Sequence, residues 1–164
     1  LIWHFIGPIQ SNKTKTIAEH FDWVHSVDRL KIARRLSEQR PEGMPPLNIC
    51  LQVNISGEES KAGVSLAELP ELANAVNSLP GIRLRGLMAI PAPADDSAAR
   101  RAPLAAVREA QAALELPLDT LSMGMSDDLA EAIQEGASIV RIGSALFGAR
   151  DYSIPPTHSE RGSN

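Results

Sequence analysis

Two motifs near the carboxyl end of the sequence contain residue types that can hold a phosphate group. The first is Ser122-Met-Gly124-Met-Ser126, and the second is Gly143-Ser144. Glycines let backbone N–H groups approach a ligand closely, and serine hydroxyls donate hydrogen bonds to its oxygens. Helices expected after Ser126 and Ser144 would add positive dipole ends. Together the motifs predict an uncharged phosphate cradle, although glycine and serine also serve as ordinary turn and cap residues.

Arg141 is a charged residue inside the apolar run 139–142. A cation in a buried strand needs a partner, so Arg141 either binds a ligand beside the cradle or belongs to a structural ion pair. His4, Asn54 and Met88 also fall on expected strands or strand ends, where they would face the same site. A hydrogen-bonded interior histidine is the alternative for His4, and simple packing is the alternative for Met88.

Other reactive residue types lack a pattern that favours chemistry. His20 and His25 have no metal-ligand spacing with each other or with Cys50, so no metal site is predicted. Cys50 lies in an apolar run, where a small buried thiol is the expected state. Lys13 and Lys61 have polar neighbours and are expected to be solvated lysines, although a desolvated lysine there could form a Schiff base.

The apolar patterning predicts six strands separated by helices. The strands are expected at residues 2–6, 23–27, 47–55, 84–90, 120–123 and 139–142, and the helices at 13–21, 28–40, 65–79, 97–116 and 126–135. Such alternation indicates a parallel sheet, which is either a doubly wound open sheet or a closed barrel. A closed barrel of this class needs eight strands, so we expect residues 1–152 to be a partial barrel that lacks about two βα units. Residues 153–164 are expected to form a disordered polar tail.

Composition limits the partners. The 164 residues are 43% hydrophobic and 22% charged, with a formal net charge of −4, as in an ordinary globular domain. A net negative chain has no long-range attraction to nucleic acid or anionic lipid, so neither is predicted as a partner. The sequence has no apolar stretch long enough to span a membrane. A single cysteine fits a reducing compartment, and we expect a cytoplasmic protein with a small-molecule ligand.

Five motifs of the chain resemble, in order and spacing, the YggS/PROSC family of pyridoxal 5′-phosphate (PLP) homeostasis proteins. The resemblance runs from Leu1 to about Ser153. The motifs are His4-Phe-Ile-Gly-Pro-Ile-Gln-Ser-Asn-Lys13, Val27-Asp-Arg29, Gly86-Leu-Met-Ala-Ile-Pro91, Ser122-Met-Gly-Met-Ser-Asp-Asp128 and Val140-Arg-Ile-Gly-Ser-Ala-Leu-Phe-Gly-Ala-Arg150.

The resemblance implies a TIM-type (β/α)8 barrel of the alanine racemase N-terminal type, which binds PLP as a carrier or buffer and has no strong catalytic activity. Ser122, Gly143 and Ser144 would hold the phosphate, and Arg141 would face the pyridine nitrogen. The family's Schiff-base lysine lies on the first strand of its barrel and is not among these 164 residues. Full-length members are expected to be monomers, with PLP-dependent apo-enzymes as further partners.

An arginine opposite the pyridine nitrogen keeps that nitrogen unprotonated, because a guanidinium stays charged at working pH. The ring is then a poor electron sink, which favours a carrier over a racemase-like PLP enzyme. A racemase would also need a tyrosine base, and the one tyrosine, Tyr152, lies near the tail. A third hypothesis is an interaction module: an incomplete barrel exposes an apolar seam, so this chain is expected to be less stable than a full-length member or to associate.

Overall fold

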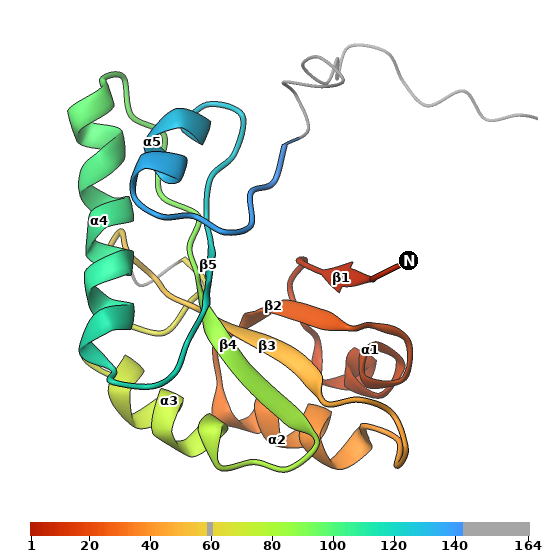
Figure 1. Ribbon diagram of the computed structural model, residues 1–164. Coiled ribbons are helices and arrows are strands. Elements are labelled where there is room, and N and C mark those ends of the chain that lie inside the picture. The colour runs from red at the N-terminus through yellow and green to blue at the C-terminus, as the bar shows by residue number, and fades with distance from the viewer. Residues whose placement is uncertain (59–60, 143–164) are drawn as a thin grey trace, which may run out of the picture.

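The computed structural model describes residues 1–58 and 61–142. Gly143, Ser144 and the expected tail therefore lie outside the described residues. Five strands form one sheet in chain order, and every neighbouring pair is parallel. They are β1 (His4–Phe5), β2 (Trp23–Val27), β3 (Leu47–Gln52), β4 (Ile82–Met88) and β5 (Thr120–Ser122). The predicted parallel sheet is confirmed, and Figure 1 shows its strands following one another from β1 to β5.

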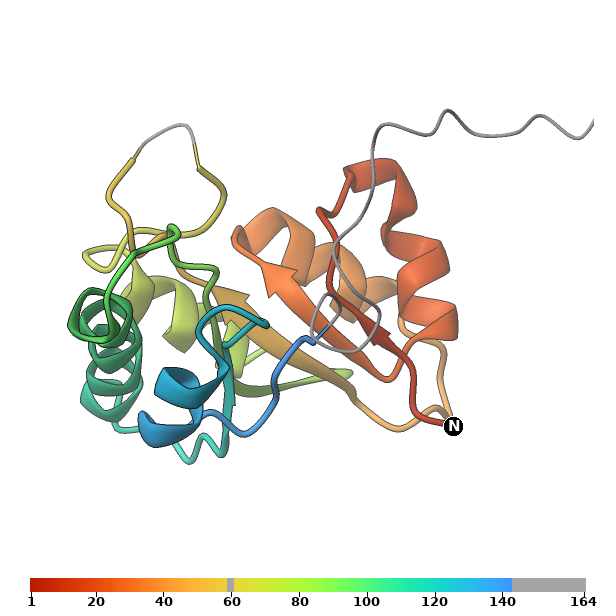
Figure 2. The ribbon, with the colours of Figure 1, turned by 90° about the horizontal axis from the view of Figure 1, so that it is seen from above.

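Helices connect the strands and pack around the outside of the curved sheet. They are η1 (Ser11–Lys13), α1 (Thr14–His20), α2 (Leu30–Gln39), α3 (Leu69–Asn77), α4 (Ser97–Ala113) and α5 (Leu129–Gln134). Figure 2 shows the series running from α1 beside β1 and β2 to α4 and α5 at the other end of the sheet. The arrangement is part of a barrel, with an outer apolar layer and an inner face. None of the described helices has the length and apolar character needed to cross a membrane.

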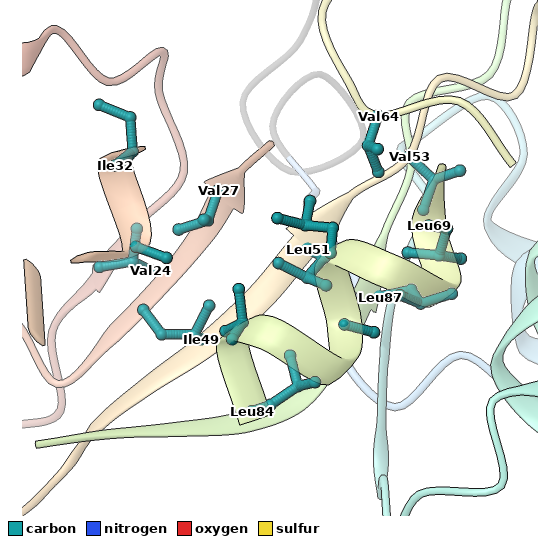
Figure 3. Close-up of a cluster of buried hydrophobic side chains, with 14 of the residues drawn as sticks. Val24, Val27, Ile32, Ile49, Leu51, Val53, Val64, Leu69, Leu84 and Leu87 are labelled. Carbon is teal, nitrogen blue, oxygen red and sulfur yellow. The ribbon is translucent and has the colours of Figure 1, made fainter. Parts of the chain in front are cut away.

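The core lies between the outer face of the sheet and the helices. In β3, Leu47, Ile49 and Leu51 are fully buried against this layer, while Asn48 and Gln52 alternate with them and point to the inner face. Figure 3 shows the cluster, to which β2, β4, α2 and α3 also contribute. In β3 the period of two thus places leucine and isoleucine in the core and leaves Asn48 and Gln52 for the interior of the curve.

Two glycines set the geometry of the last strands. A Cβ on Gly86 would overlap the backbone oxygen of Thr120, its partner in the β4–β5 register, so the two strands approach closely only because residue 86 is glycine. Gly124 follows β5 with a φ of +105°, and a Cβ there would lie 2.6 Å from the Ala132 side chain. The chain therefore turns sharply at the first predicted phosphate motif.

The expected strand 139–142 is wrong within the described residues. Ile139 makes one isolated parallel bridge to Ser122, and the ladder stops there. The turn at Gly124 carries the backbone away, although the Arg141 amide still donates to the Gly124 carbonyl at 2.9 Å. Arg141 accordingly lies in an irregular segment that runs beside the end of β5.

Two helix starts differ from expectation. Asp28, the first residue of the expected helix 28–40, does not cap α2, because its Oδ2 accepts a hydrogen bond from the Gly63 amide at 3.1 Å in the loop after β3. The helix predicted from Ser126 begins at Leu129, after a turn. At the start of the expected helix 65–79, the Ser65 hydroxyl accepts a hydrogen bond from the Glu68 amide at 3.2 Å. Cys50 is fully buried as expected, and burial raises the pKa of its thiol to about 12.

Candidate functional site

The carboxyl ends of three strands and the segment after α5 converge through backbone hydrogen bonds. The Val53 amide donates to the Met88 carbonyl at 2.8 Å, and the Ala89 amide donates to the Ser122 carbonyl at 3.1 Å. The Arg141 guanidinium Nη2 then donates to the Ala89 carbonyl at 3.0 Å. Ala89 therefore joins Ser122 to Arg141, and the predicted site residues Met88, Ser122 and Arg141 come together.

Ser122 is fully buried, and its hydroxyl meets a histidine that the sequence interpretation had not placed in the site. His25 Nδ1 lies 2.7 Å from Ser122 Oγ, and His25 Nε2 lies 2.8 Å from His4 Nδ1. A chain of hydrogen bonds thus runs from exposed His4 on β1, through buried His25 on β2, to Ser122 on β5. The strand alternation of Trp23 and His25 would have placed His25 on the inner face, but it was considered only as a metal ligand.

His25 is neutral at physiological pH. Burial lowers the pKa of its imidazole to about 4, with further contributions from His4 and Arg141. Burial also lowers the pKa of His4, against an opposing attraction from Asp22. The hydrogen-bonded histidine pair is therefore a set of neutral donors and acceptors, which can orient a hydroxyl without bringing a buried charge of its own.

Arg141 is half-buried and short of acceptors. Its Nε is buried and has no hydrogen-bond partner, and across the described ranges 1–58 and 61–142 no carboxylate lies within ion-pair distance of it. Burial lowers the pKa of its guanidinium, and the attraction of Asp128 opposes this. The structural ion pair considered from the sequence is thus not found here. A half-buried cation whose buried Nε–H is unused fits a ligand that supplies an acceptor or a negative charge.

Arg85 on the same inner face is an arginine whose guanidinium nitrogens all have hydrogen-bond partners. Its Nε and Nη2 donate to the two Asp119 carboxylate oxygens at 2.9 and 2.7 Å, and its Nη1 donates to Asn48 Oδ1 at 3.0 Å. Its guanidinium carbon also lies 4.6 Å from the ring centroid of Trp23, against which His4 stacks. Arg85 therefore joins strands β2 to β5, and it is Arg141 that has donor capacity left for a ligand.

The remaining predicted residues have other placements. Asn54 lies in the loop after β3, where its Nδ2 donates to the Glu58 carbonyl at 2.6 Å and its Oδ1 accepts from the Ser56 hydroxyl at 2.9 Å. These bonds hold the loop, and Asn54 is not joined to Ser122 or Arg141 by any described hydrogen bond. Lys13 and Lys61 are exposed, as expected, and Lys61 lies 3.6 Å from Glu58.

Comparison with known proteins places the chain among one set of relatives. The family described as "Alanine racemase, N-terminal domain" matches residues 2–151. The chain is 70% identical over 155 residues to the pyridoxal phosphate homeostasis protein of Pseudomonas aeruginosa, covering 94% of this chain and 67% of the relative. It is 57% identical over 156 residues to the protein of the same name from Escherichia coli, covering 93% of this chain and 67% of that relative.

A solved structure agrees with these relatives. PipY of Synechococcus elongatus, solved with PLP bound, superposes with a TM-score of 0.82 at 38% identity, covering 90% of this chain and 71% of PipY. The chain thus spans about two thirds of the length of the curated relatives that it matches.

Proposed function

Since the chain belongs to the alanine racemase N-terminal domain family, and within it to the YggS/PROSC group of pyridoxal phosphate homeostasis proteins, we propose that it binds PLP as an intracellular carrier or buffer. In this proposal residues 1–152 form one PLP-binding unit in the cytoplasm, and residues 153–164 are a polar tail. PLP-dependent apo-enzymes are its further partners, and full-length protein is monomeric.

The donor set of the site fits PLP. The buried Ser122 hydroxyl suits a phosphate oxygen, and the unpartnered Arg141 Nε suits the lone pair of a pyridine nitrogen. We propose that Gly143 and Ser144 complete the phosphate cradle, that Met88 packs beside it, and that His4 contributes through His25. Asn54 is proposed to shape the adjoining loop. The observation that carries the proposal is Arg141, a buried cation left with an unused donor where the strand ends converge.

PLP supplies an electron-accepting ring when it is bound, and this site restrains that property. A guanidinium facing the pyridine nitrogen can only donate to it, so the nitrogen keeps its lone pair and gains no proton. We therefore propose that the protein stores the cofactor with little turnover. No tyrosine lies among the described residues to serve as the base of a racemase-like enzyme.

We also propose that the curved sheet is part of a closed (β/α)8 barrel, with β1 to β5 equivalent to strands three to seven. The support is the curvature of a parallel sheet with helices on its outside, and the free edge of β1 among the described residues. A closed barrel would enclose the inner face on which His4, His25 and Arg85 lie.

The proposal is tested by titrating the protein calorimetrically with pyridoxine 5′-phosphate and with pyridoxine. The first probe has the ring and the phosphate of PLP but no aldehyde, so it cannot react with surface lysines. We expect Ser122→Ala to weaken binding of the phosphorylated probe roughly tenfold or more, because a hydrogen bond to a charged group is lost. Pyridoxine binding should not change in that variant. Arg141→Gln should weaken both probes, since both contain the pyridine nitrogen.

Ser78→Ala is the matched control. Ser78 is an exposed serine at the end of α3 whose hydroxyl donates to the Ala75 carbonyl one turn earlier, so its loss should leave both affinities unchanged. Equal binding of pyridoxine 5′-phosphate by wild type, Ser122→Ala and Arg141→Gln would show that the site is elsewhere.

A further inference from the structure

The hydrogen-bond chain from His4 to Ser122 uses both ring nitrogens of His25. Both ring nitrogens of His25 are engaged, at 2.8 Å to His4 Nδ1 and 2.7 Å to Ser122 Oγ, and both His25 and Ser122 are fully buried. A neutral imidazole carries one N–H, so His25 must donate through one nitrogen and accept through the other. Two opposite directions of hydrogen bonding therefore satisfy the chain.

The two directions leave Ser122 in different states. In the first, His4 Nδ1–H donates to His25 Nε2, His25 Nδ1–H donates to Ser122 Oγ, and the serine O–H is free to donate elsewhere. In the second, the serine O–H is spent on His25 Nδ1, and only oxygen lone pairs remain for a ligand. A phosphate dianion only accepts hydrogen bonds, so it is compatible with the first direction and repelled by the second.

We propose that His25 is a positioning residue that keeps the Ser122 hydroxyl available as a donor to the phosphate group of PLP, and that His4 holds the His25 tautomer this requires. The inference rests on the proposed function and adds two residues that act without touching the cofactor phosphate themselves. Ser122 alone, with an apolar neighbour in place of His25, would keep its hydroxyl but lose the bond that orients it.

The surroundings of His25 favour the neutral state of its imidazole, which both directions of hydrogen bonding require. The groups that act on its charge are His4 from β1 and Arg141 from the segment after α5, and both oppose protonation, as does burial. Ser122 from β5 is uncharged. With one proton on His25, neither direction of hydrogen bonding brings a net charge into the interior, and His4 and the bound phosphate together favour the direction in which Ser122 donates.

The tautomer of His25 is measured directly in ¹⁵N-histidine-labelled protein by long-range ¹H–¹⁵N correlation, with saturating pyridoxine 5′-phosphate. We expect the proton on Nδ1 of His25. A proton on Nε2 in the bound state would overturn the inference while leaving the proposed function intact. If pyridoxine 5′-phosphate does not bind the wild type, the proposed function and this inference fail together.

A double-mutant cycle tests whether His25 acts through Ser122. His25→Phe should weaken pyridoxine 5′-phosphate binding about five- to tenfold and leave pyridoxine unaffected, and it should have no further effect in the Ser122→Ala background. His25→Asn, whose amide N–H lies close to the position of Nδ1–H, should recover most of the affinity. Independent losses that multiply in the double variant would contradict a positioning role. If His25→Phe does not fold, the tautomer measurement on wild type still decides.

Discussion

The partly buried arginines Arg85 and Arg141 differ in how completely their N–H groups are hydrogen-bonded. Arg85 has a carboxylate, an amide and an aromatic ring as partners, whereas the buried Nε of Arg141 has no hydrogen-bond partner among the residues that the structure describes. An unsatisfied buried donor costs free energy, on the order of 1–3 kcal/mol, and persists where a ligand can use it. At the residue scale, the unused donor of Arg141 is the feature that separates a binding site from ordinary barrel packing.

His25 should make the folded protein sensitive to acid. Its pKa is about 4 in the fold and near 6.5 when unfolded, so between these values the unfolded chain binds a proton that the folded chain does not. The free energy of unfolding therefore falls as pH drops through this window, by at most about 3 kcal/mol from this group. We expect His25→Phe to lose less stability than wild type when urea denaturation at about pH 7 is compared with about pH 5.

His20 provides the matched control, because it is an exposed histidine on α1. His20→Gln should follow the wild-type pH dependence. If the free energy of unfolding of His25→Phe falls between about pH 7 and about pH 5 by as much as that of wild type, His25 does not remain neutral in the folded protein.

At the scale of elements, the β4–β5 pairing positions Ser122 and depends on Gly86. Any Cβ at residue 86 would collide with the Thr120 backbone, which is not free to move because it belongs to the neighbouring strand. We expect Gly86→Ala to destabilise the protein by about 2 to 4 kcal/mol and to weaken pyridoxine 5′-phosphate binding, since Ser122 lies two residues beyond Thr120. Chemical denaturation and calorimetry measure the two effects.

Gly7→Ala is the control for the change from glycine to alanine. Its Cβ would approach nothing closer than the Phe5 ring at 3.7 Å, which is an ordinary contact. The free energy of unfolding of Gly7→Ala should lie within about 0.5 kcal/mol of the wild-type value. A Gly86→Ala variant as stable as Gly7→Ala would mean that the two strands pair less closely than described.

Regular elements could be predicted from the sequence where one pattern dominated. The strand at 23–27 and the end of the helix expected at 126–135, which is followed by Gly136 with a φ of +93°, follow from local residue types alone. The failures involve long-range partners. Asp28 opens the expected helix 28–40 but accepts a hydrogen bond from the distant Gly63 amide, and the apolar run 139–142 was expected to be a strand but is limited by the turn at Gly124.

The candidate site was predictable to a similar extent. The glycine and serine motif and the arginine in an apolar run led to the prediction of Ser122 and Arg141, and the structure brings these two residues together through Ala89. His25 was missed because its partners, His4 and Ser122, are separated from it by 21 and 97 residues. No local pattern records such pairing, and only the curvature of the sheet brings the three side chains together.

At the scale of the whole molecule, the sheet formed by residues 1–58 and 61–142 ends at β1, a short strand that pairs only with β2 within these ranges. Large apolar side chains are exposed beside it: Leu1, Ile2, Trp3 and Ile6. Unpaired strand edges flanked by apolar residues favour association. We therefore expect this chain to self-associate with increasing concentration, and Ile2→Lys to reduce that association in sedimentation velocity measurements.

Ile133→Lys is the comparison for the edge. Ile133 lies on α5 and is 58% exposed, similar to the 69% of Ile2, but it is not next to β1. Its substitution should leave the association unchanged. If Ile2→Lys and Ile133→Lys change the association equally, or if the wild type is a monomer at all concentrations, the β1 edge does not drive contacts between copies.

The central claim is that the ends of β4 and β5 and the segment carrying Arg141 surround one cofactor phosphate and ring. A crystal structure of this chain with pyridoxine 5′-phosphate tests it most directly. We predict a phosphate oxygen within hydrogen-bonding distance of Ser122 Oγ and the pyridine nitrogen facing Arg141 Nε. Ligand bound elsewhere on the molecule, with Ser122 contacting only His25 and with Arg141 Nε still unpartnered, would contradict the claim.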